Sequence, residues 1–150
     1  MRDFILDKKS DLKFLLSYHS YGNSLVIPYG SEYDELVLTA DQARIYDEII
    51  KEVDFPDGMV AGSPLDVVGY SADGDVADWA LHEAGVISMT SELGSEKVFS
   101  DTFDLGNTLA EAKVILDNIE LPFFLMEKAG VQLALVECDD AKETALLSLS

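Results

Sequence analysis

The sequence predicts an α/β fold in which helices pack on a parallel or mixed β-sheet. Short apolar segments with the length of buried strands alternate along the chain with segments that have the periodicity of helices. The strand candidates are residues 12–18, 24–27 and 86–91. Capping-box patterns, Thr39 with Gln42 and Thr108 with Glu111, mark the starts of two helices. Strands that alternate with helices are typical of α/β domains.

Length and composition limit the class of protein. The chain has 150 residues, enough for one domain with a sizeable core, and its 48% hydrophobic content excludes a disordered chain. The formal net charge of -19 disfavours binding to nucleic acids and anionic membranes and favours cations and basic partners. The longest apolar runs, such as residues 121–126, are too short to span a bilayer.

The N-terminus and the cysteine content bear on the compartment and on the kinds of metal site. Asp3, Lys8 and Lys9 make the N-terminus unlike a secretory signal, so we expect a cytosolic protein or a start that is not the natural one. Cys138 is the only cysteine, which excludes an internal disulfide and zinc sites built from several cysteines. Because the chain has two histidines, a three-histidine site is also excluded.

The first elements lie before residue 55. Residues 1–9 resemble the end of a helix with two lysines in its last turn. Residues 12–18 are nearly all apolar, which predicts a strand buried on both faces, and residues 24–27 form a second short strand. A helix follows Thr39, and its apolar residues recur at helical spacing: Ile45, Tyr46, Ile49, Ile50 and Val53.

The middle of the chain is predicted as a long loop, a short helix and a strand. Residues 56–74 are rich in Gly, Pro, Ser and Asp and are expected to form a loop. Asp75 is placed to cap a short helix that Gly85 closes, and residues 86–91 are the third strand. Residues 95–107 form another polar loop.

The last part of the chain is predicted to be mainly helical. A long helix should run from Thr108 to about Ala129, and Pro122 should kink it. Residues 131–137 are a candidate last strand, and residues 139–150 are a polar tail.

Four side chains stand out as candidates for chemistry: His19, Tyr21, Tyr70 and Glu92. His19 and Glu92 each follow an apolar strand, so they would lie together if the two strands run in the same direction. Taken singly, each of the four has an ordinary structural explanation, namely a satisfied histidine, a half-buried tyrosine or a solvated carboxylate. His82 and Glu83 are interpreted as the exposed face of the short helix, because position 86 is valine rather than the second histidine of a His-Glu-x-x-His zinc motif.

Five separated motifs connect these residues: His19-Ser20-Tyr21, Pro28-Tyr29-Gly30, Gly69-Tyr70-Ser71-Ala72, Asp78-Trp79 and Ser88-Met89-Thr90-Ser91-Glu92-Leu93-Gly94. In order and spacing, the motifs resemble the C-terminal half of the zinc carboxypeptidase family, the carboxypeptidase A-like metallopeptidases. The resemblance implies that residues 1–130 are the C-terminal half of a catalytic domain, with an extra strand and tail at 131–150. It also implies cis peptide bonds at Ser20–Tyr21 and Pro28–Tyr29.

The resemblance implies a role for each matching residue. His19 corresponds to a zinc ligand, and Glu92 corresponds to the general base that takes a proton from the zinc-bound water and returns it to the leaving amine. Tyr70 corresponds to a mobile tyrosine that closes over the C-terminal carboxylate of the substrate. Ser20 and Tyr21 correspond to residues that line the substrate groove.

The pocket for the substrate's C-terminal side chain is implied at four matching positions: Gly30, Leu65, Ala77 and Thr90. Ala77 stands where a charged residue would select a basic or acidic side chain, so a small neutral lining favours an apolar or aromatic residue. Asp75 is nearby in the sequence and supports the alternative, a preference for Lys or Arg. The expected partner is therefore the C-terminus of a peptide or protein.

The sequence departs from the family in the residues that complete the zinc site. The family's other two ligands lie in a His-x-x-Glu motif, and neither His19 nor His82 has Glu three residues later. Arg2 and Arg44, the only arginines, do not stand in the family's substrate-binding motifs. We therefore expect the chain to be the second half of a catalytic domain whose N-terminal half is missing. Alone, the chain should bind zinc poorly and be inactive.

Two further hypotheses stay open. The chain is alternatively a pseudoenzyme or acidic interaction module that retains the fold and uses its cleft or surface for binding, or an unrelated acidic α/β domain with a chance match. A half domain would expose a sheet edge and apolar faces, which predicts self-association that the negative charge moderates. The resemblance suggests secretion, although the sequence shows no signal peptide.

Overall fold

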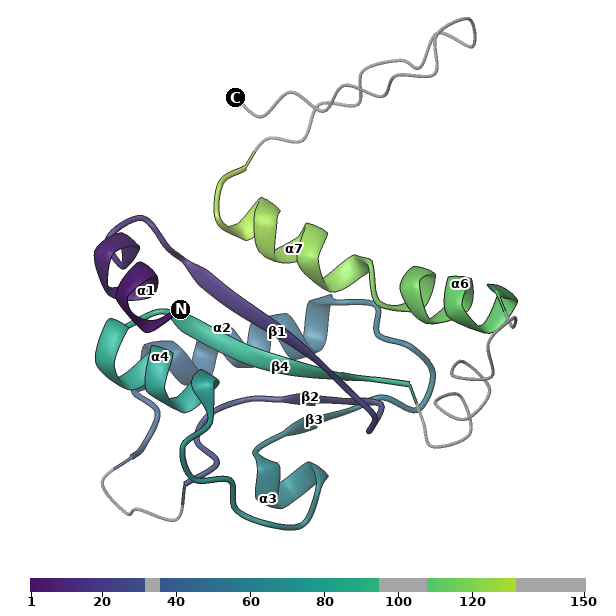
Figure 1. The fold of residues 1–150 in the computed structure, drawn as a ribbon, viewed down its shortest axis with the longest axis horizontal. Helices are drawn as coiled ribbons and strands as arrows, with labels where there is room; N and C mark the ends of the chain where they lie inside the picture. The colour runs from purple at the N-terminus through teal and green to yellow at the C-terminus, as the bar shows by residue number, and fades with distance from the viewer. Residues whose placement is uncertain (32–35, 95–107, 132–150) are drawn as a thin grey trace, which may run out of the picture.

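The computed structural model of the protein describes residues 1–31, 36–94 and 108–131. Its helices are α1 (Arg2–Lys8), α2 (Ala40–Glu52), α3 (Pro64–Val67), α4 (Val76–Ala84), α6 (Thr108–Asp117) and α7 (Glu120–Lys128). Its strands are β1 (Phe14–Ser20), β2 (Ser24–Val26), β3 (Val60–Gly62) and β4 (Ile87–Leu93). The predicted α/β fold is confirmed (Figure 1).

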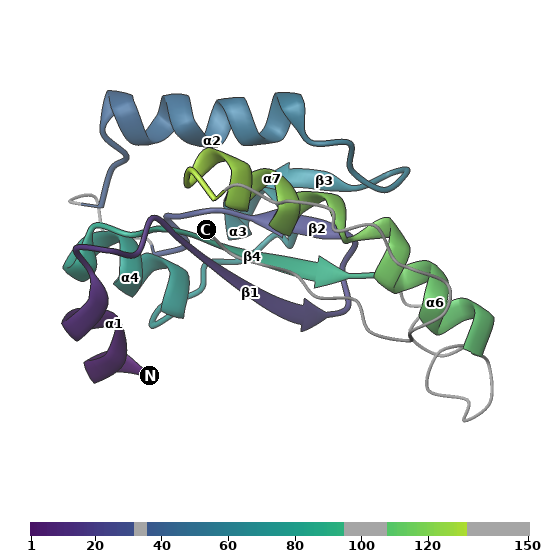
Figure 2. The ribbon, with the colours of Figure 1, turned by 90° about the horizontal axis from the view of Figure 1, so that it is seen from above.

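The strands form one mixed sheet in the order β1-β4-β2-β3. β1 runs parallel to β4, whereas β2 runs antiparallel to β4 and parallel to β3. Figure 2 shows α2 on one side of the sheet and α1 on the other. Because β1 and β4 are parallel, their carboxyl ends meet at one end of the sheet.

The apolar core packs residues of β2 and β4 against α2, α4 and α7. Its buried members are Leu25, Tyr46, Ile49, Val53, Leu81, Met89, Leu121 and Leu125. The predicted capping box starts α2, because Gln42 N–H donates to the Thr39 hydroxyl and Thr39 N–H donates to the Gln42 side chain. Gly85 closes α4 with a φ of 68°, as predicted, but Asp75 makes no side-chain capping bond at its other end.

Tyr46 joins α2 to β4 through buried hydrogen bonds. Its hydroxyl donates to the Ser88 carbonyl (2.9 Å) and accepts from Ser88 N–H (3.2 Å). Burial raises the pKa of Tyr46 well above its usual range, so the hydroxyl keeps the proton that it donates. Continuing the antiparallel register of β2 and β4 would place Pro28, which has no N–H, opposite Ser88. The tyrosine hydroxyl thus supplies the Ser88 carbonyl with a donor that a proline at this position could not provide.

Two predictions for the first two thirds of the chain are wrong. β1 begins at Phe14 and lies at the edge of the sheet, where its side chains are half-buried or exposed, so it is not a strand buried on both faces. The segment 56–74 is not a continuous loop, because it contains β3 and α3. Pro64 in the first turn and a capping box between Ser63 and Asp66 start α3.

The long C-terminal helix is instead two helices, α6 and α7, with a break at Asn118 and Ile119. Pro122 is the third residue of α7, a position at which a backbone N–H has no partner within the helix. The proline ring is therefore accommodated in the first turn of α7, and the prediction that it kinks one longer helix is wrong. The predicted loop at 95–107, the side chains of the Thr108 capping box and almost all of the predicted segments at 131–137 and 139–150 lie outside the described residues.

Lys128 links α7 to α2 at the surface. Its ammonium group pairs with Glu48, lies 3.3 Å from Glu52 and sits 5.1 Å from the centre of the Phe124 ring. Hydrogen bonding to Lys128 lowers the pKa of Glu48. A lowered carboxyl pKa stabilises the folded state above the unfolded pKa of 4.5, and this stabilisation is lost as the pH falls through the lower folded value.

We expect Lys128→Ala to lower the melting temperature near neutral pH and to lower it progressively less as the pH falls below 4.5, toward the lower folded pKa at which Glu48 becomes protonated. Lys51→Ala is the matched control, because Lys51 is an exposed lysine whose ion pair lies within α2, with Asp47 at 3.0 Å. Thermal unfolding followed by circular dichroism across this pH range measures both variants. An effect of Lys128→Ala that is the same at every pH would contradict the electrostatic link between the two helices.

Candidate functional site

His19 and Glu92 lie opposite each other at the carboxyl ends of β1 and β4. The parallel register pairs these two residues, which confirms that the strands bring them together. His19 Nδ1 lies 3.8 Å from Glu92 Oε1, and the two side chains are 57% and 20% exposed. This distance is too long for a hydrogen bond, so the two groups share a site without using each other's hydrogen-bonding capacity.

The sheet face that carries this pair is polar. Residues in register on neighbouring strands point to the same face, which places Ser17, His19, Ser24, Thr90 and Glu92 together, with Val26 as an apolar neighbour opposite Thr90. The opposite face carries Met89 and Leu25 of the apolar core. The hydroxyls of Ser24 and Thr90 are buried and make no hydrogen bond to other described residues. Since buried hydroxyls normally have a partner, this face has unused capacity for a bound molecule.

The chain passes close to Glu92 in the turn between β1 and β2. A Cβ on Gly22 would lie 3.0 Å from Glu92 Cβ and 3.2 Å from Ser24 Oγ, so the close approach favours glycine. Gly22 N–H donates to the Gly94 carbonyl at 3.0 Å, which ties the turn to the end of β4. The Ser20–Tyr21 bond in this turn is cis, and so is Pro28–Tyr29, as the resemblance implied.

Asp78, which the sequence analysis placed in the Asp78-Trp79 motif without assigning it a role, holds the backbone beside the predicted site residue Gly30. Its side chain on α4 is buried, with 7% of the residue exposed, and it accepts from the backbone N–H groups of Gly30 and Ser31 at 3.0–3.1 Å. Burial raises the pKa of Asp78, and the two N–H bonds oppose that rise. The available signal was an aspartate between Ala77 and Ala80 on the buried face of the helix, although sequence alone does not show its backbone partners.

The other predicted site residues fall into a buried and an exposed group. Ala77 (1% exposed) and Thr90 (5%) are buried, and Gly30 is buried against α3 and α4. Leu65 (61%), Tyr70 (64%) and Tyr21 (45%) are exposed, and Ser20 is exposed at the end of β1. Ser88 Oγ donates to the Ala77 carbonyl at 2.5 Å, which holds α4 to the strand that carries Thr90.

The structure also shows a shallow pocket with no room for a water-sized molecule, which lies away from His19 and Glu92. It is lined by the 53–59 segment, by Ser91 and by the junction of α6 and α7. Ser91 alternates with Thr90 and Glu92 along β4, so this pocket lies on the opposite face of the sheet. The polar face is therefore the better candidate for chemistry.

The described residues do not by themselves fit a zinc ion. A catalytic zinc site has three protein ligands, and no group of three or more His, Cys, Asp or Glu side chains that could hold a metal is found in residues 1–31, 36–94 and 108–131. The imidazole of His19 has the right donor chemistry but is one ligand. His82 is exposed on α4, 3.8 Å from Glu83, as predicted.

A comparison with protein-family models matches residues 1–115 to a model described as zinc carboxypeptidase. The chain belongs to the zinc carboxypeptidase family. The matched segment includes all four strands and every residue of the polar face. The family assignment makes the protein metallocarboxypeptidase-like, in a family of zinc-dependent peptidases that cleave the C-terminal peptide bond.

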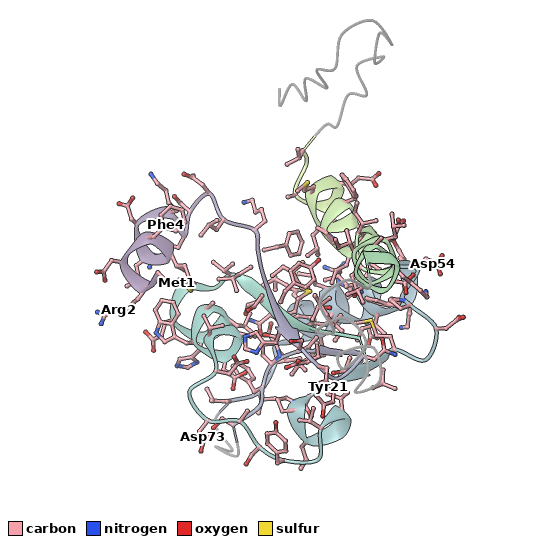
Figure 3. The ribbon with its side chains drawn as sticks, turned by 45° about the vertical axis from the view of Figure 1, so that its right-hand side comes forward. Met1, Arg2, Phe4, Tyr21, Asp54 and Asp73 are labelled. Atoms are coloured by element: carbon pink, nitrogen blue, oxygen red, sulfur yellow. The ribbon has the colours of Figure 1, made fainter. Side chains whose placement is uncertain are left out.

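Neither arginine of this zinc carboxypeptidase homologue lies in the candidate site. Arg2 pairs with Asp3 at 3.9 Å, and Arg44 pairs with Asp41 at 3.5 Å. Figure 3 shows Arg2 pointing away from the body of the molecule, far from Tyr21 at the end of β1. Within the described residues, no helix is long and apolar enough to cross a membrane.

Proposed function

We propose that the chain supplies part of a carboxypeptidase active site, which hydrolyses the C-terminal peptide bond of a peptide or protein. The observation that carries this proposal is the pairing of His19 with Glu92 on a polar sheet face in a member of the zinc carboxypeptidase family. The paired side chains lie at one end of the sheet, beside the cis Ser20–Tyr21 turn.

His19 is proposed as one ligand of the zinc ion, with the remaining ligands contributed by residues outside this 150-residue sequence. The basis is the ligand count, since the sequence has no His-x-x-Glu motif and the described residues hold no group of three ligands. The chain alone is therefore proposed to be inactive.

Glu92 is proposed as the residue that accepts a proton from the attacking water and returns it to the leaving amine. Its carboxylate is mostly shielded from solvent, with 20% of the side chain exposed, and its Oε1 lies 3.8 Å from His19 Nδ1. General bases of this kind must reach the proton they remove. Tyr70, Ser20 and Tyr21 are proposed to contact the substrate.

The pocket for the substrate's C-terminal side chain is proposed to prefer an apolar residue. Ala77 is small and uncharged, and the nearby Asp78 carboxylate is occupied by backbone N–H groups. Asp75 at the start of α4 is the argument for a preference for Lys or Arg instead. Hydrolysis rates for peptides that end in Phe and in Lys distinguish these preferences.

The polypeptide that completes the site is proposed to cover the outer edge of β1 and the apolar surface beside it. In the described part of the chain, β1 pairs only with β4. Exposed apolar residues continue along the C-terminal helices: Ile115, Leu116, Ile119, Phe123 and Met126. The Tyr18 hydroxyl donates to the Asn118 carbonyl at 3.2 Å and so joins this surface to β1. An open strand edge with adjoining apolar surface favours association with another segment or with a second copy.

The purified chain is expected to release no C-terminal amino acid from a peptide that ends in Phe. Adding a family polypeptide that carries His-x-x-Glu is expected to produce zinc-dependent release, which His19→Ala abolishes and His82→Ala preserves. Zinc-dependent release by the chain alone would contradict the shared site. Formation of a complex without activity would support the alternative, a pseudoenzyme that uses this face for binding.

A further inference from the structure

A backbone hydrogen bond ties the loop that carries Tyr70 to the turn after β2. Gly69 and Gly74 bound this loop, with φ values of 81° and 79°, and a Cβ at either position would meet no atom within 4 Å. Ala72 N–H donates to the Gly30 carbonyl at 2.8 Å. Tyr70, two residues before this bond, is 64% exposed. The Ala72–Gly30 bond therefore has a large influence on where the loop rests.

A second bond reinforces the same attachment. The Ser31 hydroxyl donates to Asp73 Oδ1 at 2.8 Å, so adjacent residues of the turn after β2 hold adjacent residues of the loop. A Cβ on Gly30 would lie 2.6 Å from Pro64 Cγ and 3.3 Å from the Ala72 carbonyl oxygen. The turn is thus packed directly against α3 and the loop, and the backbone at Gly30 can approach this closely only because it has no side chain.

Asp78 holds the turn after β2 in place. Gly30 N–H lies 3.1 Å from Oδ1 and 3.0 Å from Oδ2, and Ser31 N–H lies 3.1 Å from Oδ2. The Asp78 carboxylate, which projects from α4, therefore accepts from two successive backbone N–H groups of the turn. Only 7% of Asp78 is exposed. Hydrogen bonds to a buried carboxylate are stronger than bonds between neutral groups.

We propose that Asp78 is a positioning residue of the peptidase site, which acts through the Gly30–Ser31 backbone to set the resting position of the loop that carries Tyr70. The chain of contacts runs from α4 through the turn after β2 to residues 72 and 73. The relevance to catalysis rests on the proposed role of Tyr70. The positioning itself is a property of the 150-residue chain.

Amide hydrogen exchange of the full chain, followed by NMR, tests the positioning. Asp78→Ala is expected to accelerate exchange at Gly30, Ser31 and Ala72 by about ten- to a hundredfold, the factor that corresponds to the loss of hydrogen bonds to a charged group. Asp78→Asn retains one oxygen acceptor and should give a smaller acceleration. Asp75→Ala is the matched control, because it removes a carboxylate from the same helix that makes no capping bond.

The ring signals of Tyr70 provide a readout that a purely structural role would not change. If Asp78 positions the loop, the shift of these signals is smallest in Asp75→Ala, larger in Asp78→Asn and largest in Asp78→Ala. The amides of β4 keep their protection in all three variants. Faster exchange spread equally over α4 and β4, or unchanged exchange at Ala72, would overturn the proposal. The measurement needs no peptidase activity, so the result stands apart from the reconstitution experiment.

Discussion

Replacing Glu92 by Gln is expected to lower kcat of the reconstituted peptidase by about 10²- to 10⁴-fold, the usual contribution of a general acid–base residue. Glutamine has nearly the same shape but cannot accept a proton from the attacking water. KM should change much less, because Glu92 lies across from His19 rather than among the exposed residues proposed to contact the substrate. Steady-state kinetics with a peptide that ends in Phe measure both constants.

Glu83→Gln is the matched control for this substitution. Glu83 is an exposed glutamate on α4 that is 3.8 Å from His82, a histidine outside the candidate site. This variant should retain the kcat of the unchanged protein. Folding of the Glu92→Gln variant is checked separately by its melting temperature. Full activity of the reconstituted Glu92→Gln variant would exclude Glu92 as the proton acceptor. This conclusion would hold even though the family polypeptide had made the unchanged chain active.

Tyr46→Ala is expected to destabilise the folded protein by about 3–5 kcal/mol, the range for removing a large aromatic side chain from a core. Tyr46 is 1% exposed, and its ring packs with the core of α2, β2 and β4. Tyr46→Phe keeps the ring but removes the hydroxyl that pairs with Ser88. Because it leaves a buried N–H without its partner, we expect Tyr46→Phe to cost about 1–3 kcal/mol.

Urea unfolding at neutral pH measures both variants. Arg44→Ala on the exposed side of α2 is the control, since the ion pair of Arg44 with Asp41 is a surface pair and its loss should change stability by less than about 0.5 kcal/mol. If Tyr46→Phe is as stable as the unchanged protein, the hydroxyl bridge to β4 does not contribute. If Tyr46→Ala is also unaffected, the assignment of Tyr46 to the core is wrong.

Local patterns predicted the elements whose signals lie within a few residues. The Thr39–Gln42 capping box starts α2, and Gly85 ends α4 in the left-handed conformation. Both depend on hydrogen bonds or backbone angles between near neighbours, so the sequence is sufficient. β1 shows the limit of this reasoning, because its apolar residues predict a strand but do not specify which strands flank it.

The break between α6 and α7 and the presence of β3 and α3 in the segment 56–74 show the same limit. Helical periodicity continues across Asn118, so the pattern predicts one helix where the chain forms two. β3 is three residues long and exists through its pairing with β2. Such short strands have too little periodicity to identify, because their stability comes from the neighbouring strand.

The sequence by itself determined the α/β class, the start of α2 at Thr39, the end of α4 at Gly85 and the likeness to zinc carboxypeptidases, since these depend on residue order and local chemistry. It also predicted that His19 and Glu92 meet if their strands are parallel. Only the tertiary structure decided that they do, at 3.8 Å, and that Asp78 holds Gly30 from 48 residues away. Long-range contacts of this kind depend on how the strands and helices pack, and no local pattern of residues records that packing.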